Sequence, residues 1–173
     1  MAELELLTER LRLRPLREAD LDELVALYGD PRVEPWIGHH SPEDVAVELS
    51  FHVAHWNRFG WGLWAVEELA SGAFIGDCGL QPLEMVGPEV ELGYEIAPER
   101  WGRGLATEAA RASVRHGLEE LGMERIVAVT KPGNERSRRV LEKSGLAHVG
   151  EREAYGDRLL LYELAAPSSG RFA

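Results

Sequence analysis

The chain has 173 residues, of which 45% are hydrophobic and 28% are charged, and this composition is usual for one soluble globular domain. Its formal net charge of −11 opposes nonspecific binding to nucleic acids, because that binding depends on basic side chains that neutralise phosphates. The single cysteine excludes an intrachain disulfide, and no apolar run approaches the roughly 20 residues that a membrane-spanning helix needs.

The beginning of the chain, residues 1–5, is acidic and lacks the basic and then apolar pattern of a secretion signal. Together with the lone Cys78, this predicts a cytoplasmic protein whose partners include neither a membrane nor a nucleic acid. The acidic surplus is compatible with a cationic substrate such as an amine, although solubility alone also explains it.

Apolar periodicity and turn residues divide the chain into strands and helices. Alternating apolar and basic residues predict the first strand. The Ser41-Pro42 pair is a favourable helix start, because serine caps free amides and proline suits the first helical position. In chain order, the expected elements are strand 11–14, helices 20–28 and 41–59, strands 62–67, 73–80 and 90–96, helix 105–121, strand 125–130, helix 134–144, and strands 146–152 and 158–164. The segment 35–40 is expected to be a loop.

This order combines an antiparallel half with a strand–helix–strand unit, which predicts the α+β (mixed α/β) class. We expect a single domain over residues 1–173, with a central mixed, mostly antiparallel sheet of about seven strands flanked by about four helices. Residues 165–173 are rich in serine, glycine and proline, which predicts a flexible tail.

A glycine-rich loop, Trp101-Gly102-Arg103-Gly104-Leu105-Ala106, joins strand 90–96 directly to the next helix. Its two glycines allow the backbone to bend and to approach a ligand closely. The first amides of the helix have no partner within it, so together with Arg103 they favour an anion such as a pyrophosphate. The loop has no lysine, which opposes a P-loop, and it lacks the third glycine of a dinucleotide-binding motif. Glycines that merely permit a tight turn remain the alternative.

Three segments form an ordered set of motifs: Gly93-Tyr94-Glu95-Ile96-Ala97-Pro98, residues 101–109, and residues 134–146, which begin with Asn134-Glu135-Arg136-Ser137. In this order and spacing they resemble the GNAT acetyltransferase superfamily. The resemblance is closest to the branch that acetylates the N-termini of ribosomal proteins, and it extends over about residues 11–164.

This resemblance implies the GNAT fold, with strands splayed at the cofactor site, and acetyl-CoA as the co-substrate. The backbone amides from Gly102 to Ala106 would hold the CoA pyrophosphate, Asn134 would contact pantetheine, and Ser137 would lie near the sulfur. Trp101 stands where the family usually has glutamine or arginine, so that side chain's role does not carry over. The expected cofactor-binding residues are Ile96, Ala97, Gly102, Arg103, Gly104, Leu105, Ala106, Thr107, Asn134, Ser137 and Arg138.

Acetyl transfer to an amine needs a base for the amine and a hydrogen-bond donor for the leaving thiolate. Glu91, Glu95 and Asp77 are the candidate bases, and Glu91 is favoured because it lies deeper, before the expected cofactor slot. A solvated strand face is the alternative interpretation of these carboxylates. The Ser137 hydroxyl is the candidate donor, with helix capping beside Asn134 as its alternative.

Other side chains are weaker candidates, because surface exposure or core packing explains each of them at least as well. These are His39 and His40 over the acceptor, Tyr155 and Tyr162 as acids, Trp56, Trp61 and Trp64 around an acceptor pocket, Arg136, Arg138 and Arg139 at a CoA phosphate, and Cys78 as a nucleophile. No spacing of histidine, cysteine and acidic residues suggests a metal site.

We therefore predict an N-acetyltransferase that moves the acetyl group of acetyl-CoA to a primary amine. The amine attacks directly in a ternary complex, and a protein N-terminal α-amine is the first candidate acceptor. One alternative is acetylation of a small molecule, such as a polyamine, an amino acid or a drug. Another is a CoA-binding sensor without catalysis. Exposed apolar tryptophans are compatible with a homodimer.

Overall fold

The computed structural model describes residues 4–167, and its centre is one eight-stranded sheet with the strand order β1-β2-β3-β4-β5-β6-β8-β7. The strands are β1 (Leu6–Leu7), β2 (Leu11–Pro15), β3 (Leu63–Glu68), β4 (Phe74–Pro82), β5 (Val90–Ile96), β6 (Arg125–Thr130), β7 (Ala147–Ala154) and β8 (Asp157–Ala165). Every neighbouring pair is antiparallel except β5 and β6, which are parallel. The predicted α+β class with a mixed, mostly antiparallel sheet is therefore confirmed.

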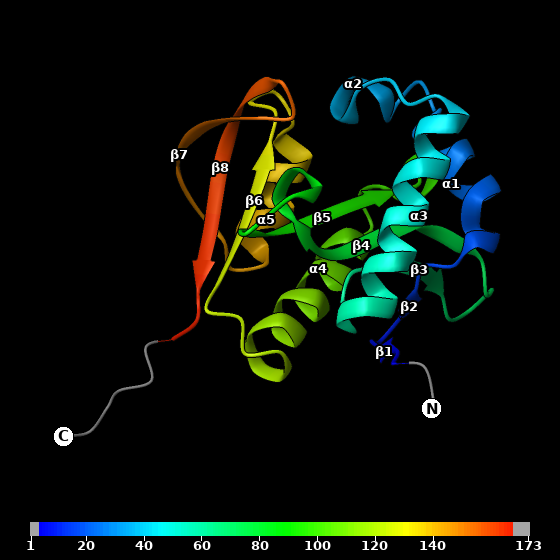
Figure 1. The fold of residues 1–173 in the computed structure, drawn as a ribbon, viewed down its shortest axis with the longest axis horizontal. Helices are drawn as coiled ribbons and strands as arrows, with labels where there is room; N and C mark the ends of the chain where they lie inside the picture. The colour runs from blue at the N-terminus through cyan, green and yellow to red at the C-terminus, as the bar shows by residue number, and fades with distance from the viewer. Residues whose placement is uncertain (1–3, 168–173) are drawn as a thin grey trace.

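The described residues form five α-helices, of which α1, α3, α4 and α5 pack against the sheet. They are α1 (Leu21–Tyr28), α2 (Glu34–Ile37), α3 (Pro42–Phe59), α4 (Leu105–Arg115) and α5 (Glu135–Lys143). One buried cluster joins the sheet to α4 and α5 through Leu105, Ala109 and Leu141, and a second joins it to α1 and α3 through Leu24 and Leu49. Figure 1 shows β5 in the middle, with α1 and α3 on one side and β6, β7 and β8 on the other.

Local signals set the limits of the longest helix, α3. The Ser41 Oγ accepts a hydrogen bond from the Asp44 amide at 3.2 Å, and the Asp44 carboxylate accepts one from the Ser41 amide at 2.9 Å. Gly60 ends the helix with a left-handed φ of 72°, a conformation that glycine adopts without strain. Val45 and Leu49 on α3 pack against the sheet, and Glu48 and His52 line the cavity described below.

The two parallel strands in the middle of the sheet separate after a single point of contact. β5 and β6 share one register pair, Glu91 with Val127, whereas the neighbouring β4 and β5 stay paired from Gly76–Ile96 to Pro82–Val90. The remaining backbone groups of the two strands therefore face a gap rather than each other. This divergence confirms the strand splay that was expected at the cofactor site.

Two elements were not predicted, and both are too short to carry a periodic pattern. β1 has two residues, which pair with β2 through Leu6–Leu13 and Leu7–Arg12. The expected loop at 35–40 instead begins inside α2, a single helical turn. The long helix expected at 105–121 is α4 followed by a π-helical turn, His116–Glu120.

The expected C-terminal tail falls mostly outside the described residues. Ala165 still closes β8, and the amide of Ala166 donates to the carbonyl of Glu124 at 2.8 Å. Residues 168–173 lie outside the described part, so their flexibility stays a prediction. Within residues 4–167, no helix is both long and apolar enough to span a bilayer.

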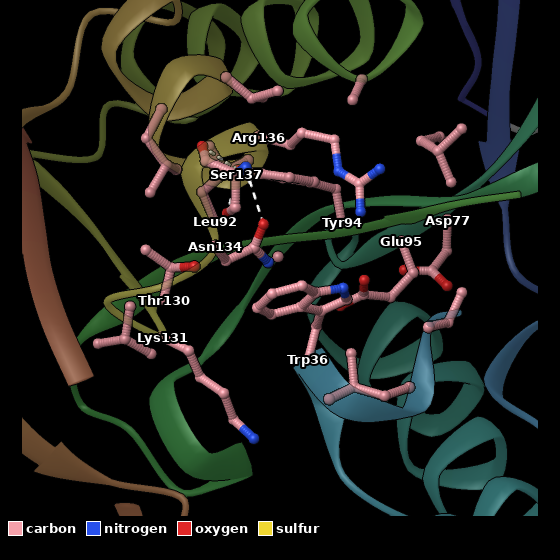
Figure 2. A pocket seen from close by; sticks show the side chains of 18 of the residues that line it. Trp36, Asp77, Leu92, Tyr94, Glu95, Thr130, Lys131, Asn134, Arg136 and Ser137 are labelled. Atoms are coloured by element: carbon pink, nitrogen blue, oxygen red, sulfur yellow. Dashed lines mark hydrogen bonds between the residues drawn. The ribbon is translucent and has the colours of Figure 1, made fainter. Parts of the chain in front are cut away.

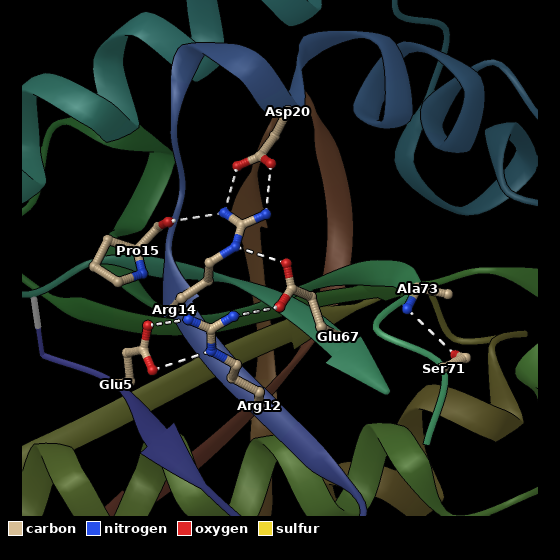
Figure 3. A network of polar contacts seen from close by, with 8 residues as sticks. All are labelled: Glu5, Arg12, Arg14, Pro15, Asp20, Glu67, Ser71 and Ala73. Atoms are coloured by element: carbon tan, nitrogen blue, oxygen red, sulfur yellow. Dashed lines mark hydrogen bonds and ion pairs between the residues drawn. The ribbon is translucent and has the colours of Figure 1, made fainter. Parts of the chain in front are cut away.

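A buried ion pair holds β2 to the turn that precedes α1 (Figure 3). Arg14 donates to both carboxylate oxygens of Asp20, at 2.9 and 2.7 Å, and to Glu67 on β3 at 2.7 Å. Arg14 and Asp20 are only 7% and 6% exposed. Removing one partner of such a pair leaves the other charge buried and uncompensated.

We therefore expect Arg14→Met to lower the free energy of unfolding by about 3 kcal/mol, measured by chemical denaturation. Arg12→Met is the matched control, because the Arg12 side chain is 40% exposed where it pairs with Glu5 and Glu67. That change should lower the unfolding free energy by less than about 1 kcal/mol. Similar losses of unfolding free energy in Arg14→Met and Arg12→Met would contradict the conclusion that burial makes the Arg14 ion pair important.

Candidate functional site

A cavity of about 590 Å³ opens where β5 and β6 diverge (Figure 2). This volume is within the usual range for a small-molecule site. The starts of α4 and α5 line one half, and residues of α1, α2, α3, β4 and β5 line the other. Figure 2 shows Asn134 and Ser137 on one side of the view and Asp77 on the other, with Trp36 between them. Two ligands can therefore meet beside β5, each contacting a different set of elements.

The loop before α4 has the features of an anion site. Gly102 and Gly104 adopt left-handed φ angles of 75° and 78°, and no side chain caps the first amides of α4. The Trp101 indole anchors the loop by donating from Nε1 to the Ile96 carbonyl at 2.7 Å, and the Arg136 guanidinium lies 3.8 Å from the centre of its ring. Uncapped amides at a helix N-terminus, close to an arginine, suit a phosphate group.

Most of the cofactor-binding residues expected from the sequence lie on the cavity wall. Those that line it are Ile96, Gly102, Gly104, Leu105, Ala106, Thr107, Asn134 and Ser137. Ala97, Arg103 and Arg138 do not line it: Arg103 is exposed, and Arg138 Nε donates to the Tyr162 hydroxyl at 3.3 Å. For these three, contact with the cofactor stays a prediction. Of the basic cluster on α5, the cavity lining includes Arg136 and Arg139.

Ser137 and Asn134 have different roles at the start of α5. The Asn134 Oδ1 accepts from the Ser137 amide at 3.1 Å and so caps the helix. The Ser137 hydroxyl instead lies 2.8 Å from the Tyr94 hydroxyl, whose single proton goes either to the Ser137 hydroxyl oxygen or to the Ser137 carbonyl at 3.0 Å. When Tyr94 donates to the hydroxyl oxygen, the Ser137 proton is free for a ligand. Capping therefore does not explain the Ser137 side chain, and its hydroxyl is available on the cavity wall.

The three candidate bases lie on one face of β4 and β5 and line the cavity. Asp77 is opposite Glu95 in the strand register, and Glu91 lies four positions before Glu95. Asp77 and Glu91 are only 1% and 5% exposed, so the alternative of a solvated strand face is wrong for both. Among the described residues, no lysine or arginine forms an ion pair with any of the three.

Glu91 is held by two side chains from other elements. The Gln81 amide donates to Glu91 Oε2 at 3.1 Å, and the Tyr155 hydroxyl donates to the same oxygen. Burial raises the pKa of Glu91 to about 7, against the opposing effect of these two hydrogen bonds. A carboxyl group with this pKa changes its protonation state near neutral pH, as a general base must.

The raised pKa of Asp77 should make the stability of the fold depend measurably on pH. Burial raises its pKa from the ordinary 3.8 to about 7, although the Tyr28 hydroxyl donates to it at 2.9 Å. Between about pH 4 and 7 the folded chain keeps a proton that the unfolded chain releases, so this group makes the fold less stable as pH rises.

We therefore expect Asp77→Asn to gain stability relative to wild type as pH rises, by at most about 1.4 kcal/mol per pH unit up to pH 7. Urea denaturation of both proteins at pH 5 and at pH 8 measures this difference. The same difference at both pH values would contradict the raised pKa of Asp77.

The weaker candidates fall into two groups. His40 and Tyr155 line the cavity, whereas His39 is exposed and Tyr162 is fully buried in the core. Trp56, Trp61 and Trp64 belong to the core cluster or pack against it, as the simpler interpretation held. Burial raises the pKa of the Cys78 thiol to about 12, which fits packing rather than nucleophilic chemistry.

Several lining residues have no signal in the linear pattern. Trp36 lies on the unpredicted α2, and Tyr28 and Glu48 come from separate helices. Tyr94 shares a face of β5 with Val90, Leu92 and Ile96, yet its hydroxyl contacts Ser137. Only the strand register and the helix positions bring these residues together.

Known proteins are similar to this chain in sequence and in fold. The acetyltransferase (GNAT) domain family matches residues 10–147. YkkB of Bacillus subtilis (strain 168) is 32% identical over 165 residues, which are 94% of this chain and 96% of YkkB. YdaF of the same strain, named as a proposed ribosomal N-acetyltransferase, is 29% identical over 148 residues, 83% of this chain and 81% of YdaF. An acetyltransferase structure from Agrobacterium tumefaciens matches with a TM-score of 0.82 at 29% identity and 95% coverage of both chains.

Proposed function

The chain belongs to the GNAT acetyltransferase family, and on that basis we propose that it transfers the acetyl group of acetyl-CoA to a primary amine. One observation supports this most strongly: a single cavity carries uncapped helix amides at one end and the carboxyl groups of Asp77, Glu91 and Glu95 at the other. The first end suits the phosphates of CoA, and the second suits a cationic acceptor.

On the donor side, the amides of residues 102–107 would bind the pyrophosphate of CoA. Backbone groups of Ile96 on the unpaired part of β5, together with Asn134, would bind the pantetheine amides. Bound there, acetyl-CoA supplies a thioester carbonyl as the electrophile. Ser137, on the same wall, would lie near the sulfur.

On the acceptor side, Glu91 would take the proton from the amine, directly or through one water molecule. A lysine-like amine needs this help, because its deprotonation at pH 7 costs about 4–5 kcal/mol. The amine nitrogen then attacks the thioester carbon, the carbon–nitrogen bond forms, and the carbon–sulfur bond breaks. The departing thiolate accepts a hydrogen bond from the Ser137 hydroxyl, whose oxygen accepts from Tyr94. The nitrogen then loses its second proton, and the sulfur takes up one proton to leave as the thiol of CoA.

The acceptor is either a protein N-terminus or a small-molecule amine. Thiol release from acetyl-CoA, measured against N-terminal peptides, polyamines and amino acids, separates these classes. Release with one class supports the transferase and identifies its acceptor. CoA binding by calorimetry without release for any amine would support a sensor instead and oppose the proposed reaction.

The proposed role of Ser137 predicts a selective loss of turnover. We expect Ser137→Ala to lower kcat about tenfold, because the thiolate loses one donor, while CoA affinity changes less than about threefold. Initial rates and calorimetry measure the two quantities. Tyr94→Phe should have a smaller effect on kcat, because it removes only the partner that orients Ser137. An unchanged kcat in Ser137→Ala would contradict a role for this hydroxyl in transfer.

A further inference from the structure

The part of the cavity farthest along β5 from Glu91 carries a second group of polar side chains. Glu48 and His52 lie four residues apart on α3 and therefore share a face of that helix. Asp77 and Glu95 are opposite each other on β4 and β5, and all four residues line the cavity. Figure 2 shows the Asp77 and Glu95 carboxyl groups close together beside Trp36.

Two of these side chains have hydrogen-bonding capacity that the protein does not use. His52 is only 6% exposed, and among the described residues its ring makes no hydrogen bond. Burial lowers the pKa of His52 to about 4, so its neutral ring keeps one nitrogen as an acceptor. The Glu95 carboxyl group likewise accepts no hydrogen bond from any described residue.

Two of the basic residues that line the cavity are bound to groups outside this set. Arg100 forms an ion pair with Glu68 at 2.9 Å, and Lys131 donates to the Pro35 carbonyl at 3.0 Å. His40 lies 3.2 Å from Glu48, which leaves Asp77 and Glu95 without a positively charged partner among the described residues. Asp77 is buried and Glu95 is half-buried. Carboxyl groups withdrawn from water are normally paired or protonated, so a cationic ligand would supply the partner that these two lack.

We propose that Glu48, His52, Asp77 and Glu95 form a second cation subsite, and that the acceptor carries a second ammonium or similar cation besides the amine that is acetylated. This proposal rests on the proposed acetyl transfer. The reactive amine lies towards Glu91, four residues before Glu95 on the same face of β5, a separation of about 13 Å between the two backbone positions. An acceptor with two amines on a flexible chain spans the space between the two carboxylate groups.

Paired substrates of equal chain length test this proposal. We would measure kcat/KM for 1,5-diaminopentane against n-pentylamine, and for 1,8-diaminooctane against n-octylamine. Each pair differs only in the second amine. In wild type the preferred diamine should exceed its monoamine by about tenfold or more, and in Glu95→Gln and Asp77→Asn this ratio should fall towards one.

Glu43→Gln is the matched control, because Glu43 is an exposed carboxylate on α3 that does not line the cavity. It should keep the wild-type ratio, which excludes a general effect of lowering the net negative charge. A role of Asp77 and Glu95 only as bases would lower the rates of both amines equally and leave the ratio unchanged. That outcome, or a wild-type ratio near one, overturns the subsite.

Calorimetry separates the subsite from the transferase activity. Binding of each amine is measured in the presence of CoA, without turnover, for the wild type and Glu95→Gln. If no amine releases thiol, the proposed function fails, yet tighter binding of the diamine that is lost in Glu95→Gln still supports the subsite. If thiol is released but the diamine binds no better than the monoamine, the subsite fails and the transferase stands.

Discussion

Gly104→Asp should weaken CoA binding about 100-fold or more, equal to about 2.7 kcal/mol, while the chain still folds. Gly104 immediately precedes α4, and no side chain caps the first amides of this helix. An aspartate at this position would accept hydrogen bonds from those amides and would place a negative charge where the pyrophosphate is expected. Calorimetric titration with CoA measures the loss.

Backbone strain is the competing explanation, because Gly104 has a left-handed φ of 78°. Gly72→Asp controls for it: Gly72, in the turn between β3 and β4, has a φ of 70°, and an added Cβ there meets no atom within 4 Å. Both variants place a non-glycine residue in the left-handed backbone region, which costs about 1–2 kcal/mol, and both add one negative charge. Only Gly104→Asp should lose CoA. Wild-type affinity in Gly104→Asp would refute the phosphate loop, and equal losses in both variants would point to strain.

The donor half of the site could be predicted from the sequence because it is built from two continuous segments. The run from Trp101 to Thr107 forms a loop and a helix start, and Asn134 and Ser137 lie within one turn of α5. Local rules of glycine conformation and helix capping act over a few residues, so the linear order contains them.

The acceptor half could be predicted only in part because it depends on contacts between distant residues. Asp77, Glu91 and Glu95 were recognised as candidate bases, but their burial follows from the β4–β5 register and from the helices that cover this face. Tyr155 reaches Glu91 across 64 positions of the chain, from the turn between β7 and β8. No local pattern specifies such an encounter.

The secondary structure was likewise predictable only where an element is long enough to show a period. Strands and helices with several turns or alternations were expected close to their observed positions, because periodic burial is visible in the sequence. β1 and α2 were not expected, since two residues or one helical turn carry no period, and β1 forms by pairing with β2. α2 matters for the site, because it places Trp36 on the wall of the cavity.

Glu91→Gln should lower kcat by about 100-fold to 10,000-fold, the range for removal of a general base, with little change in CoA affinity. Glutamine keeps the size of the side chain and an oxygen that accepts from the Tyr155 hydroxyl. The raised pKa of Glu91, about 7, adds a second readout. The base acts when it is deprotonated, so kcat/KM of the wild type, calculated for the unprotonated amine, should rise with pH through about 7 and level off above it. In Glu91→Gln this rise should be absent.

The pH profile also decides between the candidate bases, because Asp77 has a raised pKa of about 7 as well. If the rise in kcat/KM persists in Glu91→Gln but disappears in Asp77→Asn, the base is Asp77 and the assignment to Glu91 is wrong. Unfolding would not explain a loss of activity in Glu91→Gln or Asp77→Asn. Each change removes a buried carboxyl group whose charge is unfavourable at neutral pH, so neither should destabilise the fold. Thermal unfolding at pH 8 checks this, because both variants should be at least as stable as the wild type. If both variants are as stable as the wild type, the base is the residue whose replacement abolishes the pH dependence of the reaction. The carboxyl group of the other residue, Asp77 or Glu91, is then free to bind a cation.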